Sequence, residues 1–349
     1  MILPSLLRQP AITLACAALK VLFTPARRRP RPARPPRRIL VLRRCCLGDV
    51  LMTTPLLRAL DEAYPDATIT YATGGWSAAA IRGNPRVDRL IEMPDRQGPR
   101  ELAQLAGRLR RERFDLAVLP ERSPLVPLVA LLAGIPRRVG FDSAHRGFAL
   151  TDPVLVRGVR HEVERALDLA RALGIPVPSP RLEYRPGAEA GARVARLLAE
   201  HSVASPLLVI HPGGGANPGA VMDAKRWPPE RFGAAADGLL ARHGGGVILV
   251  GGSGDRAAVD ATRAAMRGAA LDFCGALDLD ALAALCRRAA LYVGNDSGAT
   301  HLAEACGAPT VVVFGPTDPA MYGPVDGVGE AVWDPIACTP FIERGDLTR

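Results

Sequence analysis

Short apolar runs and amphipathic stretches alternate along most of this 349-residue chain. In the first half, five runs rich in leucine and β-branched residues predict strands, at 39–44, 68–75, 87–93, 115–120 and 137–141. Apolar residues at helical spacing predict three helices between them, at 50–63, 100–113 and 124–133. Such alternation is typical of a parallel sheet covered by helices on both faces. The pattern therefore predicts an α/β fold.

The second half repeats this plan after the proline-rich segment PVPSPRLEYRP at 176–186. Strands are predicted at 207–211, 246–252, 271–274, 291–293 and 310–314. Helices are predicted at 187–201, 229–243, 255–267, 279–289 and 300–306. We therefore expect two Rossmann-like, doubly wound parallel-sheet domains, 38–180 and 181–349, facing a cleft. In such sheets, ligands collect beyond the carboxyl ends of the strands.

One glycine-broken turn, GNDSG at 294–298, indicates a phosphate site. It lies between a predicted strand and a short helix, so the amides of Ser297, Gly298 and Thr300 can bind an anion at the positive end of the helix. In the simpler interpretation, Asp296 or Ser297 only caps that helix. The turn makes a nucleotide diphosphate the first ligand to consider.

A second glycine cluster supports the phosphate interpretation. HPGGG at 211–215 is again a strand that runs into glycines, and KRW at 225–227 follows it before a new helix. The amides of Gly213 and Gly214 are candidates for binding phosphate oxygens, as glycine loops do. Two such turns in one half of the chain favour a ligand over two coincidental caps.

Composition separates a near-neutral body from a basic N-terminus. Residues 1–44 hold eleven of the 44 Lys and Arg residues and none of the 35 Asp and Glu residues, which leaves 33 basic against 35 acidic residues elsewhere. A nucleic-acid enzyme usually carries basic residues on its body, so no nucleic-acid partner is expected. The seven cysteines have no C-x-x-C pair and no regular spacing, which favours a reducing compartment over a zinc site or a disulfide framework.

The segment 1–24 is mainly apolar and runs directly into an arginine- and proline-rich stretch at 27–38. Arg8 and Pro10 interrupt it, so its uninterrupted apolar length is too short to span a bilayer. We expect a cytoplasmic protein, peripheral on the inner face of the cell membrane, that meets anionic lipid through residues 1–44. A secretory signal and a disordered tail are the alternatives, although arginines after an apolar stretch resist export.

Four motifs in order resemble the ADP-heptose:lipopolysaccharide heptosyltransferases of glycosyltransferase family 9. They are LGDVLMTTP (47–55), HPGGG with KRWP (211–228), VGGSGD (250–255) and GNDSGATHLAEACGAPTVVVFGPTDP (294–319). The resemblance covers residues 38–325 and leaves 1–37 as an N-terminal extension. It implies a glycosyltransferase B fold, an ADP-sugar donor on the C-terminal domain, an acceptor on the N-terminal domain and inversion at the sugar carbon.

The N-terminal domain carries the candidate catalytic base and candidate acceptor contacts. Asp49 stands at the tip of the first predicted strand, where a carboxylate could accept the proton of an attacking sugar hydroxyl. The resemblance places the family's base at this residue, and capping of the helix at 50–63 is the alternative role. Arg82, Arg137 and Arg138 could meet acceptor anions, with solvated surface positions as the simpler interpretation.

Four side chains of the C-terminal domain are candidates for donor binding. Lys225 would neutralise the leaving diphosphate, so its replacement by alanine should slow transfer, unless it is one solvated lysine among many. Asp296 orders its turn or meets the sugar, because a carboxylate aimed at a diphosphate would repel it. Asp255 follows GGSG and can take ribose hydroxyls. His301 would by itself be a packed or exposed histidine, and the resemblance makes it a donor contact.

The resulting hypothesis is a metal-independent glycosyltransferase that moves heptose, or a related sugar, from an ADP-sugar to a lipopolysaccharide core or similar anionic glycolipid. The ADP-heptose would be a substrate, so no cofactor is expected. The D-x-D form at 278–280 opens a predicted helix and is better explained as a cap than as a metal site. The alternatives are an epimerase-like nucleotide-sugar enzyme of the same architecture and a non-catalytic nucleotide-sugar-binding module.

Overall fold

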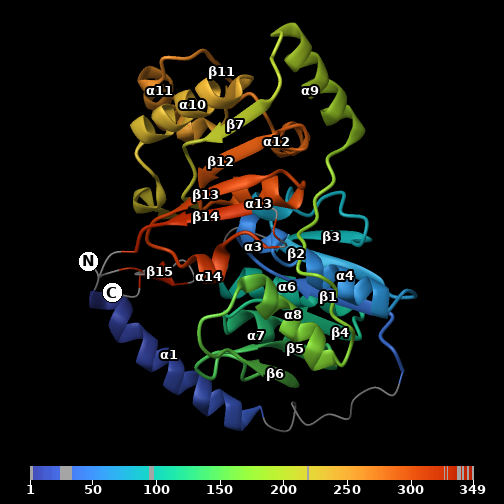
Figure 1. The fold of residues 1–349 in the computed structure, drawn as a ribbon. Helices are drawn as coiled ribbons and strands as arrows, with labels where there is room; N and C mark the ends of the chain where they lie inside the picture. Colours follow the sequence, from blue (N-terminus) through green and yellow to red (C-terminus); the bar gives the residue numbers. More distant parts are fainter. Residues whose placement is uncertain are drawn as a thin grey trace. The chain divides into compact units, whose positions relative to one another are not determined.

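The computed structural model describes residues 3–23, 34–93, 98–217, 220–325, 327, 329–335, 339, 342–343 and 346–347. The chain forms two compact units (Figure 1). The first unit comprises Met1–Cys45, Thr53–Ala78 and Pro85–Pro178, and the second comprises Cys46–Met52, Ala79–Asn84 and Ser179–Arg349. The segment that carries Asp49 therefore belongs, by its contacts, to the second unit.

The first unit is built on a six-stranded parallel sheet in the order β3-β2-β1-β4-β5-β6. Its strands are β1 (Arg38–Leu42), β2 (Thr68–Gly74), β3 (Arg89–Met93), β4 (Leu116–Leu119), β5 (Arg137–Asp142) and β6 (Asp152–Leu155). Its helices are α1 (Leu3–Leu22), α4 (Thr54–Ala63), α5 (Gly75–Ala78), α6 (Pro99–Glu112), α7 (Leu125–Leu132) and α8 (Glu162–Leu173). The parallel sheet predicted from the alternation is thus present.

Burial explains why these runs became strands. Nearly every residue of β1 and all of β4 are buried, as is expected for central strands with helices on both faces. One core cluster joins Leu40 and Leu42 of β1 to Leu105 and Leu109 of α6 and to Val129 of α7. The apolar side chains of α6 and α7 therefore pack on the face of the sheet that bears Leu40 and Leu42.

The elements that were not predicted include two edge strands of the large sheets and the helix α8. The edge strand β6 contains Pro153, which reads as a turn signal in sequence and is tolerated at a sheet edge because it cannot donate to a further strand. The edge strand β14 (Gly329–Trp333) is mostly exposed and so lacks a continuous apolar run. Helix α8 lies in the segment before the predicted boundary at 176–186.

The single helix predicted at 50–63 is two helices, α3 (Leu47–Leu51) and α4 (Thr54–Ala63). Pro55 lies in the first turn of α4, where its missing N–H costs nothing. A helix that continued through this point would set the proline ring against the carbonyl four residues earlier, at Leu51. The proline therefore ends the short helix that carries Asp49 and starts a new one.

The second unit has its own six-stranded parallel sheet, in the order β11-β10-β7-β12-β13-β14. Its other strands are β7 (Leu207–His211), β10 (Gly246–Leu249), β11 (Ala270–Asp272), β12 (Leu291–Asn295) and β13 (Thr310–Phe314). Its further helices are α9 (Ala188–Glu200), α10 (Pro229–His243), α11 (Arg256–Ala265), α12 (Leu279–Cys286), α13 (Gly298–Ala305) and α14 (Pro319–Tyr322). Two-stranded pairs are formed by β8 (Ala216–Asn217) with β9 (Ala220–Val221) and by β15 (Ile342–Glu343) with β16 (Asp346–Leu347).

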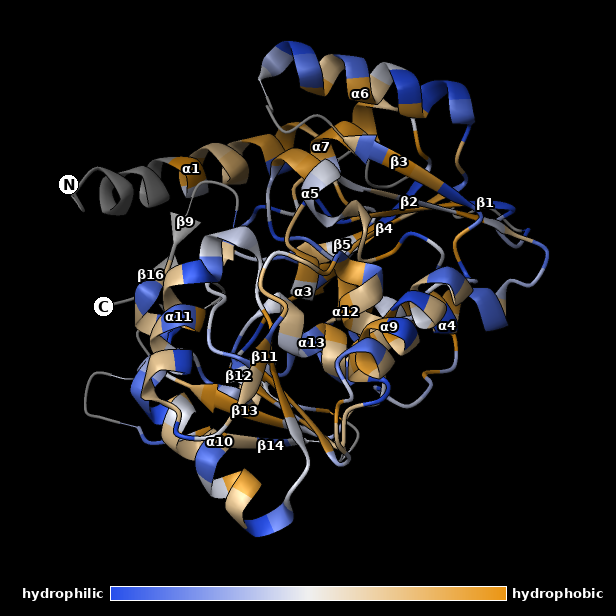
Figure 2. Ribbon diagram, turned by 90° about the horizontal axis from the view of Figure 1, so that it is seen from above, coloured by the Kyte–Doolittle hydropathy of each residue, from blue (hydrophilic) through white to orange (hydrophobic). Residues whose placement is uncertain are grey.

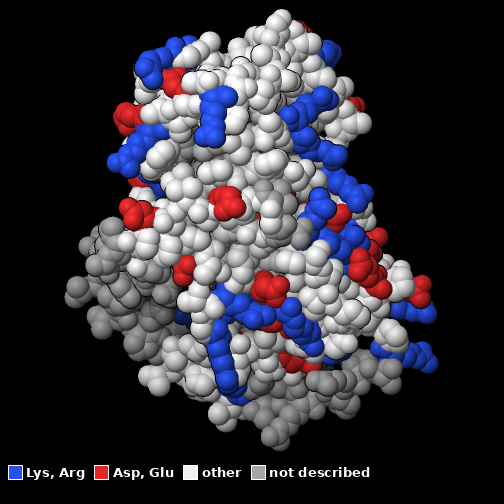
Figure 3. All heavy atoms as spheres, viewed as in Figure 1, with Lys and Arg blue, Asp and Glu red and all other residues white. Residues whose placement is uncertain are grey.

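Two separate apolar layers cover this second sheet. One joins Val194 of α9 and Leu285 of α12 to Val209 of β7. The other joins Phe232 of α10 and Val259 of α11 to the opposite face. Figure 2 shows strands coloured mainly orange and covering helices in which blue and orange residues alternate. On the face drawn in Figure 3, basic and acidic side chains of the described residues are interspersed.

Helix α1 packs on the first unit by one side only. Cys16 is buried against Phe148 and Ala149, and Leu19 and Phe23 pack against the same cluster. Phe23 stacks on Phe148 with 5.8 Å between ring centroids. Lys20 Nζ lies 2.7 Å from the buried carboxylate of Asp142. None of the helices within the described part of the chain has both the length and the apolarity to cross a bilayer.

Candidate active site

A pocket of about 280 Å³ in the second unit gathers much of the predicted site. Six of the predicted residues line it: Asp49, Lys225, Asp296, Ser297, Gly298 and His301. The walls also include Cys46, Gly48 and Tyr322, which had not been assigned a role. Gly213, Gly214, Asp255 and Thr300 are not among its lining residues. The structure therefore divides the predicted site into a pocket wall and a group outside it.

Two glycines allow α3 to lie directly against α13. A Cβ atom on Gly48 would come within 2.6 Å of the His301 ring. A Cβ atom on Gly298 would come within 2.9 Å of the Leu47 side chain. Any larger residue at either position would push the two helices apart, so the LGD and DSG motifs of the sequence meet through their glycines.

Asp49 is the third residue of α3 and not the residue that precedes the helix. Its Oδ2 accepts a 3.4 Å hydrogen bond from the N–H of Cys46, which is the N-cap. This is the carboxylate half of a capping arrangement. The bond is long and uses one oxygen, so the capping role leaves Asp49 on the pocket wall.

Asp296 is a buried residue of the pocket wall and holds Lys225 in place. Lys225 Nζ lies 2.6 Å from Asp296 Oδ2, and the hydroxyl of Thr317 donates to the same oxygen at 2.7 Å. Burial by itself would raise the pKa of Asp296, but the charge of Lys225, followed by that of His301, lowers it below its ordinary value. The carboxylate is therefore ionised at neutral pH, and the predicted phosphate-binding lysine is one half of an ion pair.

His301 faces carboxylates on two sides. Its Nε2 lies 3.8 Å from Asp296 Oδ1, and its Nδ1 lies 3.7 Å from Glu304 Oε2 on the next turn of α13. Burial would lower the pKa of His301, but Glu304, then Asp296 and Asp49, outweigh burial and raise it. Glu304 Oε1 also accepts a 2.6 Å hydrogen bond from Val325 N–H. Glu304 was not predicted as a site residue, although its i,i+3 spacing from His301 was a usable signal.

The HPGGG loop is held by Asp255, which accepts from the Gly214 amide. Asp255 accepts hydrogen bonds of 2.9 Å from Gly214 N–H and from Gly252 N–H, and lies 3.4 Å from His211 Nε2. Burial would raise the pKa of Asp255, but the His211 contact and these amides lower it. The Gly214 N–H predicted to bind phosphate therefore has an acceptor within the fold, and the contact of Asp255 with ribose stays a prediction.

Glycine is required in this loop for two separate reasons. Gly214 and Gly215 have φ values of 95° and 74°, which side chains rarely adopt. Gly213 has an ordinary φ, but a Cβ atom there would lie 2.2 Å from the Asp255 carboxylate carbon. The predicted glycine cluster is thus a packing and backbone requirement of the loop around Asp255.

Asn295 joins the three segments around the pocket and was not predicted. Its Nδ2 donates to the carbonyls of Pro212 and Gly213 at 3.0 and 2.9 Å. Its Oδ1 accepts from Trp227 N–H at 2.8 Å. The fully buried amide therefore holds the end of β12, the glycine loop and the KRW segment at fixed positions.

The turn before α13 is only partly available for an anion. Ser297 is the N-cap, and its side chain makes no capping hydrogen bond. Thr300 N–H donates to Ser297 O at 3.1 Å, and the Thr300 hydroxyl donates to Asn295 O at 2.5 Å. The amide predicted at Thr300 therefore has an internal acceptor. Ser297 and Gly298 remain on the pocket wall at the start of the helix.

Arg137 and Arg138, two of the three arginines considered for acceptor anions, have structural partners in the first unit, and Arg82 belongs to the second unit. Arg138 is fully buried and donates to the carbonyls of Ala149, Ile135 and Pro136, so its expected surface position is wrong. Arg137 lies 3.5 Å from Asp152.

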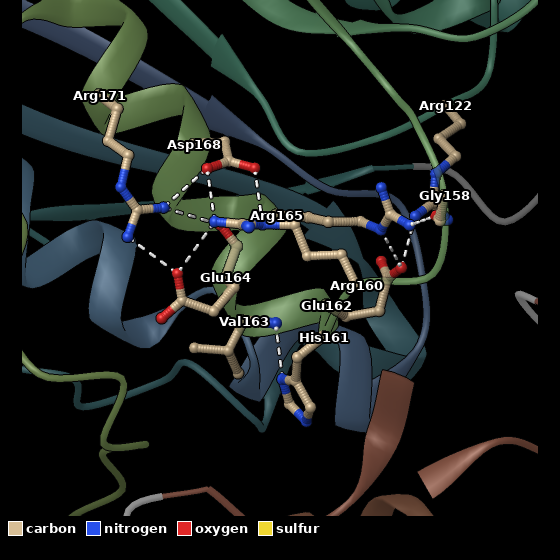
Figure 4. Close-up of polar contacts among 10 residues, drawn as sticks. All are labelled: Arg122, Gly158, Arg160, His161, Glu162, Val163, Glu164, Arg165, Asp168 and Arg171. Atoms are coloured by element: carbon tan, nitrogen blue, oxygen red, sulfur yellow. Dashed lines mark hydrogen bonds and ion pairs between the residues drawn. The ribbon is translucent and has the colours of Figure 1, made fainter. Parts of the chain in front are cut away.

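A further charged cluster at the start of α8 is also internally paired. Figure 4 shows Arg122 and Arg165 on Glu162, and Arg160 and Arg171 on Glu164 and Asp168. Because each guanidinium already faces a carboxylate, these arginines would have to give up an ion pair to bind a further anion.

The cysteines differ from expectation at one place. Cys45 and Cys46, adjacent in the chain at the entrance to α3, are both disulfide-bonded, whereas Cys16, Cys274, Cys286 and Cys306 are free thiols. The cysteine patterns sought in the sequence, a C-x-x-C pair or regular spacing, do not include adjacent cysteines and so did not predict that these two are disulfide-bonded. The predicted cap at 278–280 is confirmed, because Asp278 is the N-cap of α12 and accepts from Ala281 N–H at 2.8 Å.

Two doubly wound parallel sheets, one bearing a pocket with a carboxylate, a lysine and a helix N-terminus, define a glycosyltransferase of the B fold. The family model "Glycosyltransferase family 9 (heptosyltransferase)" matches residues 102–348. The chain belongs to this family and is a glycosyltransferase.

Individual relatives agree with this assignment. Lipopolysaccharide heptosyltransferase 2 of Escherichia coli K12 is 30% identical over 311 residues, which cover 82% of this chain and 85% of that protein. The structure of E. coli ADP-heptose lipopolysaccharide heptosyltransferase II has a TM-score of 0.71 at 28% identity, covering 86% of this chain and 92% of that one. A family 9 glycosyltransferase from Veillonella parvula has a TM-score of 0.74 at 26% identity, covering 85% of each chain.

Replacement of Glu304 by glutamine is expected to lower the pKa of His301. The amide keeps the shape and the acceptor for Val325 N–H but removes the charge that faces the ring. Because the folded pKa is raised, this contribution to stability is complete below the pKa of an unfolded histidine and is lost as the pH rises through the folded pKa. An NMR titration of the His301 ring measures the shift. Glu330→Gln, on exposed β14, is the control, and an unaltered titration in Glu304→Gln would rule out this role.

Replacing only one partner of the Lys225–Asp296 ion pair is expected to lower the free energy of unfolding more than replacing both. Lys225→Met leaves a buried carboxylate without its cation, which should reduce the free energy of unfolding by about 3 kcal/mol. The double variant with Asp296→Asn should recover part of that loss. Urea unfolding of the two single variants and the double variant measures the coupling. Additive losses would show that the pair is not coupled, and exposed Asp223→Asn serves as the control.

Proposed function

We propose that this protein is an inverting glycosyltransferase that moves heptose from ADP-heptose to a lipopolysaccharide core or a similar anionic cell-surface glycan. The observation that carries the proposal is the pocket in which Asp49 of α3 shares a wall with Ser297, Gly298 and His301 at the start of α13. A carboxylate and an anion-binding helix end in one small pocket are what transfer from a sugar diphosphate requires.

The reaction assigns a distinct task to each side of the pocket. Asp49 accepts the proton of an acceptor hydroxyl as the hydroxyl oxygen forms a bond to the anomeric carbon. The bond from that carbon to the diphosphate oxygen breaks, and ADP leaves with the electron pair. The opposite faces of the carbon are used for attack and departure, so its configuration inverts.

The leaving diphosphate is stabilised by positive groups that the fold has already positioned. Lys225 is oriented by Asp296, and its Nζ also lies 5.8 Å from the Tyr322 ring centroid. His301 lies beside Glu304 and Asp296, whose charges raise its pKa and so favour its protonated form. The amides of Ser297 and Gly298 complete the set at the helix end. Groups fixed before the reaction lower its barrier without reorganising during it.

Donor and acceptor are assigned to different units. The second unit takes the nucleotide sugar, since the pocket and both glycine loops belong to it. The first unit takes the acceptor glycan at the carboxyl edge of its sheet, from which β1 leads directly into α3.

Helix α1 is proposed to hold the protein on the inner face of the cell membrane, from the cytoplasmic side. The side of α1 opposite Cys16 and Phe23 exposes Leu14, Val21 and Leu22, with exposed fractions of 72, 77 and 69%. These positions share one face at helical spacing. Figure 2 shows the described part of α1 mainly in orange. One apolar side of α1 packs on the first unit, so the other apolar side needs a separate apolar surface to remove it from water.

The basic residues of segment 1–44 favour an anionic bilayer as the surface that covers the exposed side of α1. Residues 1–44 contain eleven Lys and Arg residues and no acid. Residues 24–33, which hold the arginine-rich part of this run, lie outside the described residues. Basic residues beside an apolar helix favour anionic lipid through charge and through apolar burial together.

Asp49→Asn is expected to lower the transfer rate by at least about a hundredfold while donor affinity changes less than twofold. The amide can still accept from Cys46 N–H, so α3 keeps its cap, but it cannot take a proton. Radiolabelled heptose transfer and calorimetric ADP binding measure the two effects. Full turnover in this variant would refute Asp49 as the base, and donor binding without transfer in the wild type would favour the non-catalytic module. Exposed Asp223→Asn is the matched control.

Replacing Leu14, Val21 and Leu22 together by asparagine is expected to weaken vesicle binding at least tenfold, because three side chains lose burial in the lipid. Co-sedimentation with vesicles containing anionic phosphatidylglycerol measures binding, and added salt should weaken it. The control replaces Leu155 and Val159, which are exposed at 57 and 62% elsewhere in the first unit. Equal binding by both variants would exclude α1 as the lipid contact.

A further inference from the structure

Trp76 is the one tryptophan of this chain without a packing role. Its side chain is 59% exposed, and it makes no hydrogen bond or ring contact with the described residues. Trp227 packs edge-to-face on Phe232 at 5.0 Å, and Trp333 donates its Nε1–H to Gly315 O at 3.0 Å. An indole ring is the largest apolar surface a residue can offer, so leaving it in water is costly unless a ligand covers it.

The backbone around Trp76 is fixed although its ring is exposed. The hydroxyls of Thr73 and Ser77 are hydrogen bonded at 2.9 Å, and Ser77 and Ala78 are buried. The short helix α5 therefore turns its neighbouring side chains inward and holds Trp76 outward. A rigid aromatic residue loses little conformational freedom when a ligand stacks on it.

Trp76 also stands where the fold collects ligands. It follows β2, whose end is joined to the end of β1 by a 3.0 Å hydrogen bond from Gly74 N–H to Arg44 O. Arg44 lies five residues before Asp49 in the chain. The carboxyl ends of β1 and β2 thus form one edge of the sheet. This edge lies beside the topological switch point between β1 and β4, where the strand order reverses.

Polar side chains at the same edge suit a carbohydrate. A side chain at position 75 would come within 3.9 Å of Glu92 Oε2, so this carboxylate lies beside the turn that carries Trp76. Arg44 lies 3.6 Å from Glu121 and remains partly exposed. Sugars combine apolar C–H faces with a rim of hydroxyls, so an exposed aromatic ring with a carboxylate and a guanidinium on neighbouring strands of the same sheet edge matches both parts.

We propose that Trp76 is the stacking platform of an acceptor subsite, on which a sugar ring of the acceptor glycan lies while Glu92 and Arg44 bind its hydroxyls. This inference rests on the proposed glycosyltransferase function and deepens it, because it assigns the acceptor side of the reaction to a named residue. The ligand class is a pyranose ring within an oligosaccharide.

The test compares Trp76→Ala, Trp76→Phe and a control, Val159→Ala, with lipopolysaccharide core oligosaccharide freed of its acyl chains as the acceptor. Trp76→Ala should raise the acceptor KM at least tenfold and leave the donor KM within twofold. Trp76→Phe should retain most of the affinity, since a smaller ring still stacks. In the wild type the same oligosaccharide should change tryptophan fluorescence, and Trp76→Phe should abolish that change.

Each result has a separate meaning. Wild-type transfer with an unchanged acceptor KM in Trp76→Ala would overturn the subsite and leave the proposed function standing. No transfer by the wild type to any core oligosaccharide would instead count against the proposed function. A loss of vesicle binding in Trp76→Ala, without a change in KM for the acyl-free acceptor, would overturn the subsite and assign Trp76 to the lipid surface.

Discussion

The buried carboxylate of Asp296 is the group around which the pocket is organised. It binds Lys225 at 2.6 Å and Thr317 at 2.7 Å, and faces His301 at 3.8 Å. A buried anion is stable only when cations and donors surround it. The carboxylate therefore holds the Lys225 ammonium and faces the His301 ring on the pocket wall before any ligand arrives, and the strand-to-helix turn that carries it is tied to the KRW segment.

Three polar side chains supply the remaining rigidity. Asn295 ties the turn to the glycine loop and to Trp227, and Asp255 ties that loop to Gly252. Glu304 connects His301 to Val325, just beyond the pocket residue Tyr322. Asn295 to Gly213, Asp255 to Gly214 and Glu304 to Val325 each join segments that are distant in sequence, so the pocket residues of the second unit lie on a rigid framework. Such preorganisation is what electrostatic stabilisation of a leaving group requires.

Much of the fold was predictable because it depends on local patterns. Continuous apolar runs gave the central strands such as β1 and β7, and the glycine-flanked turns gave their approximate ends. The edge strand β14 was missed because it is mostly exposed and lacks a continuous apolar run. The edge strand β6 was missed because it contains a proline, which an edge strand tolerates. The break between α3 and α4 was signalled by Pro55, but the apolar spacing from 50 to 63 concealed it.

The sequence by itself determined the α/β class, the family and the residue types of the pocket, since periodicity and short motifs are local and survive without coordinates. Only the tertiary structure decided which groups bind each other. Lys225 and Asp296 are 71 positions apart, and Gly214 and Asp255 are 41 apart. A partner over such a distance is chosen by how sheets and loops pack, so the bond between Asp255 and the glycine loop exists only once the chain has folded.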